Sequence, residues 1–214
     1  MRVAIAGGHG QIALRLARLL SARGDEVVAL IRNPDQSADV REAGAEPAVI
    51  DLEHAGEDEI AQAISGFEAV VFSAGAGPGS GSGRKETMDY GGAVKLIGAA
   101  NRAGISRYVM VSAIDANADA PGDDTFSVYL RAKGRADDAV RASGLEATVV
   151  RPGGLTNAPG TGRVSLGEHL RHGQVPRDDV AAVLVAVLDS PNTIGRTVDL
   201  VGGETPIDEA VQAL

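Results

Sequence analysis

Short apolar runs alternate along the chain with longer segments in which apolar residues recur at helical spacing. The central runs are rich in Val, Ile and Ala and lack polar alternation, which is typical of parallel strands buried on both faces. Alternating strands and helices predict a parallel sheet covered by helices on both sides. The predicted strands are Arg2–Ala6, Glu26–Ile31, Pro47–Ile50, Ala69–Ser73, Arg107–Ser112, Glu146–Arg151 and Thr197–Val201. The predicted helices span residues 11–22, 57–65, 86–103, 123–142 and 177–189.

One stretch, Gly75–Gly83, has the composition of a flexible linker between domains. A boundary there would leave the first four strands without a partner for their second face. We therefore place this stretch inside one domain spanning 1–214, as the loop after the fourth strand, where a doubly wound sheet binds its ligands. A small substrate-side region is expected around 153–175.

Composition narrows the possible partners. The net charge of −9 argues against nucleic acid and anionic membranes, which require a basic face. The chain has no cysteine, so disulfides and thiolate metal sites are excluded. The longest late apolar run, Val180–Leu188, is far shorter than the roughly twenty residues of a membrane span. We expect a cytoplasmic protein that acts on a small molecule, and the pattern leaves its oligomeric state open.

The first strand leads into the glycine cluster G-G-H-G-Q-I-A at 7–13. Glycine is frequent throughout this chain, with 28 copies, so the spacing of these glycines is weak evidence for a binding loop. The stronger evidence is the position of the cluster between a predicted strand and a predicted helix. A glycine loop between a strand and a helix directs free backbone N–H groups and the helix dipole toward one spot, which suits a diphosphate. Gly7 would permit the tight turn, Gly10 the approach of phosphate and Ala13 close helix–strand packing. The alternative is an ordinary turn without a ligand.

Five segments resemble one family. They are G-G-H-G-Q-I-A (7–13), A-A-N-R-A-G-I-S-R-Y-V-M-V-S-A (99–113), Y-L-R-A-K (129–133), S-G-L-E-A-T-V-V-R-P-G-G-L (143–155) and P-R-D-D-V-A (176–181). Together they are similar to the extended and atypical short-chain dehydrogenase/reductase superfamily, in its NmrA-like, NAD(P)-binding branch. The resemblance implies a doubly wound α/β Rossmann fold, with a mostly parallel seven-stranded sheet, helices on both faces and one cofactor site.

The end of the second strand bears on cofactor choice. An NAD site usually carries an acid there, which binds the ribose hydroxyls. Here the strand ends in Arg32, and the acids Asp25 and Glu26 lie at its other end. A guanidinium suits a 2′-phosphate through paired hydrogen bonds, so we expect NADP(H) to be preferred, with NAD(H) possible. The alternative is a solvated surface arginine.

The resemblance also implies which residues contact the cofactor. Asp51 and Leu52 would lie beside the adenine, Ser73–Gly75 along the adenosine ribose, and Pro152 and Gly153 past the nicotinamide. The full expected set is Gly7, Gly10, Gln11, Ile12, Arg32, Asp51, Leu52, Ser73, Ala74, Gly75, Lys133, Pro152 and Gly153.

Three residues match the family's catalytic Ser–Tyr–Lys set: Ser112, Tyr129 and Lys133. Tyr129 and Lys133 stand four apart on a predicted helix, which places them on one face. A neighbouring ammonium favours tyrosinate, so we expect a lowered pKa for Tyr129, with Tyr129 as proton donor and Ser112 orienting the carbonyl. The alternative is a packed tyrosine with a solubilising lysine beside it.

The chain departs from active relatives in two ways. The helix after the fourth strand carries Asp89 and Tyr90 but no asparagine, and no second serine follows Ser112. We expect an NADPH-dependent oxidoreductase of a small carbonyl, quinone or similar acceptor. The alternatives are a non-catalytic nucleotide sensor that regulates a partner and a sugar-nucleotide epimerase-like enzyme. No metal site is expected, because His169 and His172 fit a solvated helix face.

Overall fold

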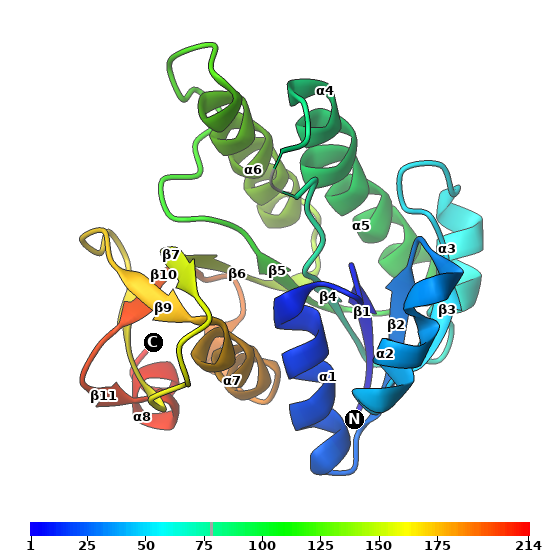
Figure 1. The fold of residues 1–214 in the computed structure, drawn as a ribbon, viewed down its shortest axis with the longest axis horizontal. Helices are drawn as coiled ribbons and strands as arrows, with labels where there is room; N and C mark the ends of the chain where they lie inside the picture. The colour runs from blue at the N-terminus through cyan, green and yellow to red at the C-terminus, as the bar shows by residue number, and fades with distance from the viewer. Residues whose placement is uncertain (78) are drawn as a thin grey trace.

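The computed structural model describes residues 1–77 and 79–214 (Figure 1). The chain folds into a nine-stranded sheet with helices on both faces. Seven of the strands run parallel, in the order β3-β2-β1-β4-β5-β6-β10. These are β1 Arg2–Ala6, β2 Glu26–Ile31, β3 Glu46–Val49, β4 Ala69–Phe72, β5 Arg107–Val111, β6 Glu146–Pro152 and β10 Thr197–Gly202. The doubly wound fold and the seven predicted strands are confirmed.

The expected count of seven strands was too low for this sheet. Strand β8 (Arg163–Gly167) pairs antiparallel with β10, and β11 (Thr205–Pro206) pairs with β8 at the edge. A separate parallel pair joins β7 (Gly154–Thr156) to β9 (Gln174–Pro176). These strands are short and only partly buried, so they lack the continuous apolar runs that identified the central strands.

The helices divide between the two faces of the sheet (Figure 1). Helices α1 (Gln11–Ala22) and α7 (Arg177–Leu188) pack on one face, where their apolar side chains share a core with Val3 and Ile5 of β1. Alternate residues of the same strand, Ala4 and Ala6, join the core on the other face. The helices on that other face are α3 (Glu57–Ala63), α5 (Gly91–Ala103) and α6 (Thr125–Arg141). Shorter helical elements are η1 (Pro34–Gln36), α2 (Ser37–Glu42), η3 (Pro191–Thr193) and α8 (Ile207–Gln212).

The helix predicted over 86–103 is interrupted. A short α4 (Ser82–Arg84) leads into a π-helical turn, η2 (Lys85–Tyr90), before α5 begins. π-turns are rare and occur frequently at functional sites. This one buries two charged side chains, Lys85 and Asp89.

The carboxyl ends of the parallel strands meet at one edge, where the loops after β1, β4, β5 and β6 come together. This is the edge at which open α/β sheets bind their ligands. The glycine-rich stretch Gly75–Gly83 follows β4 here, and its Pro78 lies outside the described residues. Among the residues described, no helix combines the length and apolar character needed to cross a membrane.

Candidate cofactor and active site

The turn after β1 depends on glycine at two positions. Gly7 adopts φ +78°, and a Cβ there would lie 2.6 Å from the backbone Cα of Ala74 in the loop after β4. A Cβ on Gly8 would lie 2.5 Å from the Cβ of Ala29 on β2. Ala13 is completely buried, as its predicted packing role requires. The turn therefore brings the start of α1 close to the loop after β4.

The N-terminus of α1 carries no competing group. Gly10 is its N-cap and supplies no side-chain hydrogen bond, and no acidic residue lies in the first turn. The first N–H groups of a helix have no acceptor within the helix, and they carry the positive end of its dipole. The donor set therefore fits a diphosphate, as the resemblance noted in the sequence leads one to expect at this place.

A cleft of about 220 Å³ opens in front of this turn, and we call it the glycine-loop cleft. Seven expected cofactor residues line it: Gly7, Gly10, Arg32, Leu52, Ser73, Ala74 and Gly75. Further lining residues that the sequence analysis did not identify are Gly8, His9, Leu30, Ile31, Gln36, Ile50, Arg84 and Met88.

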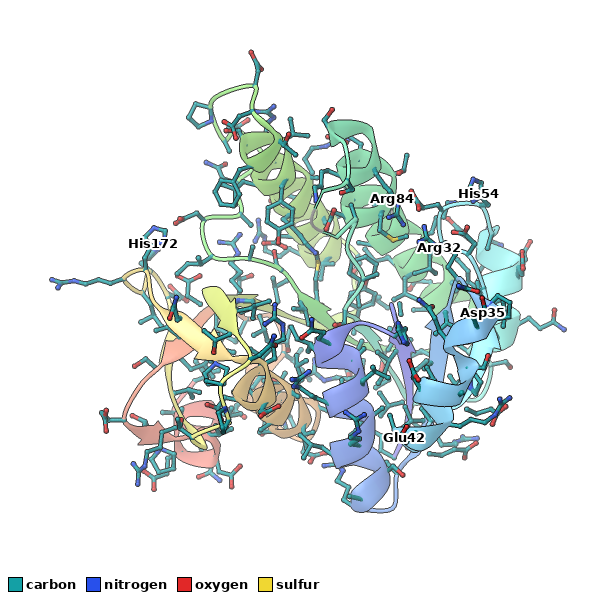
Figure 2. The ribbon with its side chains drawn as sticks, in the orientation of Figure 1. Arg32, Asp35, Glu42, His54, Arg84 and His172 are labelled. Carbon is teal, nitrogen blue, oxygen red and sulfur yellow. The ribbon has the colours of Figure 1, made fainter. Side chains whose placement is uncertain are left out.

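Two arginines meet at the far end of the cleft, and Figure 2 shows them on the same side of the molecule. Arg84 donates to Glu53 Oε2 at 2.9 Å and to the carbonyl of Ala76 at 3.0 Å. Arg32 is about half exposed and lies 3.7 Å from the same Glu53 oxygen. The sequence analysis found Arg32 but missed Arg84 and Glu53, because they are far apart in the chain and only the fold brings them together.

Three expected cofactor residues do not line the cleft or the neighbouring cavity described below. The carboxylate of Asp51 accepts from the backbone N–H of Glu53 at 3.0 Å and pairs with His54. Gly153 packs so closely that a Cβ would lie 2.4 Å from the carbonyl of Gly173. Gln11 is exposed at the start of α1. The side chain of Asp51 and the space around Gly153 are thus already engaged within the protein.

A second cavity, of about 770 Å³, adjoins the cleft, and we call it the tyrosine cavity. It shares Ser73, Ala74 and Gly75 with the cleft, so the two spaces adjoin along the loop after β4. Its lining includes the expected Ser112, Tyr129, Lys133, Ile12 and Pro152. The other lining residues are Gly77, Gly79, Ser80, Gly81, Lys85, Asp89, Val111, Thr125, Phe126 and Leu155.

Helix α6 positions Tyr129 and Lys133 in the tyrosine cavity. Asp124 caps the helix by accepting from the backbone N–H groups of Phe126 and Ser127 at 2.9 and 3.1 Å. Lys133 is almost fully buried, and its Nζ donates to the Val111 carbonyl at 3.2 Å. Tyr129 and Lys133 thus line the same cavity, as expected, and Lys133 is hydrogen-bonded to the end of β5.

Asp89 is the main residue of this cavity that the sequence analysis did not assign. Its Oδ1 lies 3.4 Å from Lys133 Nζ, and both side chains are buried. Its Oδ2 accepts from the backbone N–H of Ala76 at 3.2 Å. Asp89 lies on the helical segment after β4, where active relatives carry an asparagine. The position could therefore have identified Asp89 as a site residue, although its residue type differs.

The pKa of Tyr129 was expected to be lowered, and this was wrong. Burial raises the pKa of the phenol, while the Lys133 ammonium opposes the rise and Asp89 and Asp137 add to it. Burial is the largest of these effects, so the surroundings do not favour tyrosinate, although Lys133 is nearby and Lys85 Nζ lies 5.4 Å from the centroid of the Tyr129 ring. Tyr129 is therefore held in its protonated form at neutral pH.

The histidines also differ from expectation. His169 and His172 follow β8 in a loop, not on a helix, and His169 has φ 55°. His172 Nε2 lies 2.9 Å from Asp115 Oδ2 in an exposed pair at the left of Figure 2. Among the residues described, no three His, Cys, Asp or Glu side chains form a group that could hold a metal ion.

Comparison with known proteins identifies the family. A family model described as NAD(P)H-binding matches residues 7–191. The chain is 43% identical over 215 residues to a Bacillus subtilis protein named uncharacterized sugar epimerase YhfK, covering both chains completely. The structure superposes with a TM-score of 0.92 on a proposed NAD-dependent epimerase/dehydratase of Bacillus halodurans, at 38% identity and full coverage of both chains.

A third relative is the oxidoreductase ylbE of Lactococcus lactis, with a TM-score of 0.87 and 25% identity over 100% of this chain and 96% of that one. The family match extends from the glycine loop to beyond α7, so it includes both the cleft and the cavity. The chain therefore belongs to the NAD(P)H-binding family, as a Rossmann protein of the atypical short-chain dehydrogenase/reductase, NmrA-like type.

Proposed function

We propose that the protein is an NADPH-dependent oxidoreductase that reduces a small carbonyl compound or quinone. The observation that carries this proposal is the position of Ser112, Tyr129 and Lys133 in one cavity that adjoins the glycine-loop cleft. A dinucleotide whose diphosphate lies at the glycine loop can extend its nicotinamide toward these side chains. When bound, NADPH supplies the hydride.

The residues of the chain supply the proton and the orientation. Tyr129 Oη would give its proton to the carbonyl oxygen, and with the hydride that a bound cofactor would supply to the carbon the product is an alcohol. Burial keeps the phenol protonated until that step. Lys133, held by Asp89 and the Val111 carbonyl, is a fixed positive charge one helical turn along α6 from the phenol. Ser112 would orient the substrate through a hydrogen bond near the reacting carbon.

The mouth of the tyrosine cavity supports an apolar substrate. Phe126 is 64% exposed and Leu155 is 37% exposed, and both line the cavity. The rings of Phe126 and Tyr129 are 6.1 Å apart between centroids. Exposed apolar side chains at a cavity rim indicate a ligand-binding surface. We favour an acceptor with an apolar body over a free sugar.

Preference for NADPH over NADH belongs to the same proposal. Arg32 and Arg84 lie together at the far end of the glycine-loop cleft, where two guanidiniums suit a 2′-phosphate. Glu53 pairs with both arginines, so a bound 2′-phosphate would have to replace part of these ion pairs.

The test is NADPH oxidation against a panel of aldehydes, ketones and quinones. Tyr129→Phe should lower turnover by ~10²–10⁴, the loss expected for a general acid, while NADPH affinity persists. The matched control is Tyr90→Phe, since Tyr90 stacks under Arg135 at 4.0 Å and lies outside the cavity lining. Equal turnover in wild type and Tyr129→Phe would show that Tyr129 is not the donor. Tight NADPH binding without any turnover would favour a nucleotide sensor, and epimerisation without net NADPH loss would favour the epimerase.

A further inference from the structure

Three buried side-chain atoms lack a hydrogen-bond partner within residues 1–77 and 79–214: Asp89 Oδ1, Ser112 Oγ and Asp137 Oδ1. All three surround Lys133. Asp89 pairs with its ammonium, Ser112 follows the residue whose carbonyl Lys133 binds, and Asp137 lies one turn further along α6. Buried polar atoms without partners are rare, and they often mark functional positions.

The strand register places Ser112 and Asp137 on the same side of the sheet. Met110 and Val149 belong to the core beneath α6, whereas their neighbours Val111 and Val150 belong to the opposite core. Alternation therefore directs Ser112 and Arg151 toward α6. Ser112 continues the β5–β6 pairing, since its backbone N–H donates to Val150 at 2.7 Å.

The Asp137 carboxylate is held by one oxygen and free at the other. Arg151 Nε and Nη2 both contact Asp137 Oδ2 at 2.8 Å, while Oδ1 has no partner. Burial raises the pKa of Asp137, and the nearby Ser112 hydroxyl and the charges of Arg151 and Lys133 oppose that rise. The guanidinium of Arg151 thus binds one oxygen of the Asp137 carboxyl group and leaves the other oxygen available on the side of the sheet where Ser112 lies.

A serine hydroxyl has one proton to donate, and its lone pairs accept. We propose that Asp137 is a positioning residue that accepts a hydrogen bond from the Ser112 hydroxyl, so that the lone pairs of Ser112 are directed to the tyrosine cavity. The inference rests on the proposed function and narrows its substrate class. Tyr129 is then the donor to the carbonyl oxygen, and Ser112 accepts from a hydroxyl or N–H group next to that carbonyl. The acceptor is an α-hydroxy- or α-aminocarbonyl compound with an apolar body.

The deciding experiment is a carbon-13 NMR titration of the aspartate carboxyls, with Asp137 assigned through bonds from its own amide. If Ser112 donates to the carboxylate, Ser112→Ala should raise the pKa of Asp137 by about one unit, the effect of losing one hydrogen bond to a charged group. Asp138, the neighbouring exposed aspartate paired with Arg141, is the internal control and should not move. An unchanged or lowered pKa of Asp137 would overturn the proposal, whether or not the protein turns over any substrate.

A kinetic comparison tests the substrate class separately. The quantity compared is the ratio of kcat/KM for 2-hydroxyacetophenone to kcat/KM for acetophenone. This ratio should be roughly tenfold larger in wild type than in Ser112→Ala, because one neutral hydrogen bond contributes about this factor. Asp137→Asn can donate its amide to Ser112, so it should lose the same preference, while Asp138→Asn should keep it. An equal preference in wild type and Ser112→Ala would refute the acceptor role of Ser112. Absence of turnover with both ketones would contradict this substrate class, while the titration would still decide the contact between Asp137 and Ser112.

Discussion

At the turn after β1, the glycine-loop cleft is bounded by glycines and backbone N–H groups, whereas the adjoining tyrosine cavity contains buried ionisable side chains. This turn requires the absence of a side chain at Gly7, because a Cβ there would collide with the backbone of Ala74. The cavity requires their presence, because Lys133 and Asp89 are buried together and neutralise each other. The two regions should therefore fail in different ways when they are altered.

The largest expected effect is on stability in the tyrosine cavity. Lys133→Met leaves Asp89 as a buried charge without its partner, which should lower the free energy of unfolding by about 3–5 kcal/mol. Urea unfolding measures this. The control is Lys95→Met, because Lys95 binds the carbonyls of Leu52 and Glu53 and lies outside this pair. The double variant Lys133→Met/Asp89→Leu should recover most of the loss. A single variant as stable as wild type would contradict the ion pair's role.

The next effect is on binding in the glycine-loop cleft, with the fold preserved. A Cβ on Gly10 would lie 3.1 Å from the Gly7 carbonyl, which a small shift accommodates, but the methyl groups of valine would fill the phosphate position. Gly10→Val should weaken NADPH about a hundredfold, the upper range of an overpacking cost. Gly56→Val is the matched control, because Gly56 is also a helix N-cap and lies outside the cleft. Fluorescence titration that finds equal affinity for wild type and Gly10→Val would remove the dinucleotide interpretation.

A smaller effect is expected at the two arginines. Arg32→Ala and Arg84→Ala should each weaken NADPH roughly tenfold, the loss of one charge-assisted hydrogen bond at a partly exposed site, and leave NADH nearly unchanged. Glu53→Gln should strengthen NADPH, since it removes the competing carboxylate. Arg41→Ala is the control, because Arg41 is exposed and does not line the cleft. Parallel losses for NADPH and NADH would disprove the 2′-phosphate assignment.

The smallest effect concerns the cap of α6, which holds Tyr129 in the cavity. Hydrogen bonds from Ser127 and Phe126 lower the pKa of Asp124 below its ordinary 3.8. The stabilising effect of this carboxylate is complete above pH 3.8 and is lost as the pH falls through the folded-state pKa. Asp124→Ala should therefore lower Tm at pH 7, and the difference from wild type should close in acid. Asp123→Ala is the control, and a difference that widened in acid would show that the cap does not work through its charge.

The sequence predicted the sheet better than the site. The seven parallel strands could be found because each is buried on both faces and reads as a continuous apolar run. The glycine loop could be found because its position between β1 and α1 is local in the chain. The pairing of Lys133 with Asp89 could not be found, because charged residues in a helical pattern are normally assigned to the surface. The protonated state of Tyr129 was missed for a similar reason, since it depends on burial by segments distant in the chain.

The π-turn at 85–90 makes the number of residues in this segment matter as much as their identity. An α-helix turns about 100° per residue, so deleting one residue that lets η2 relax to an α-helix would rotate the preceding side chains by about that angle relative to α5. Asp89 would then lose its place next to Lys133 even if it were retained. A one-residue insertion or deletion here would therefore separate Asp89 from the buried lysine in one step. Alignments across this segment should therefore be checked for length before residues are equated.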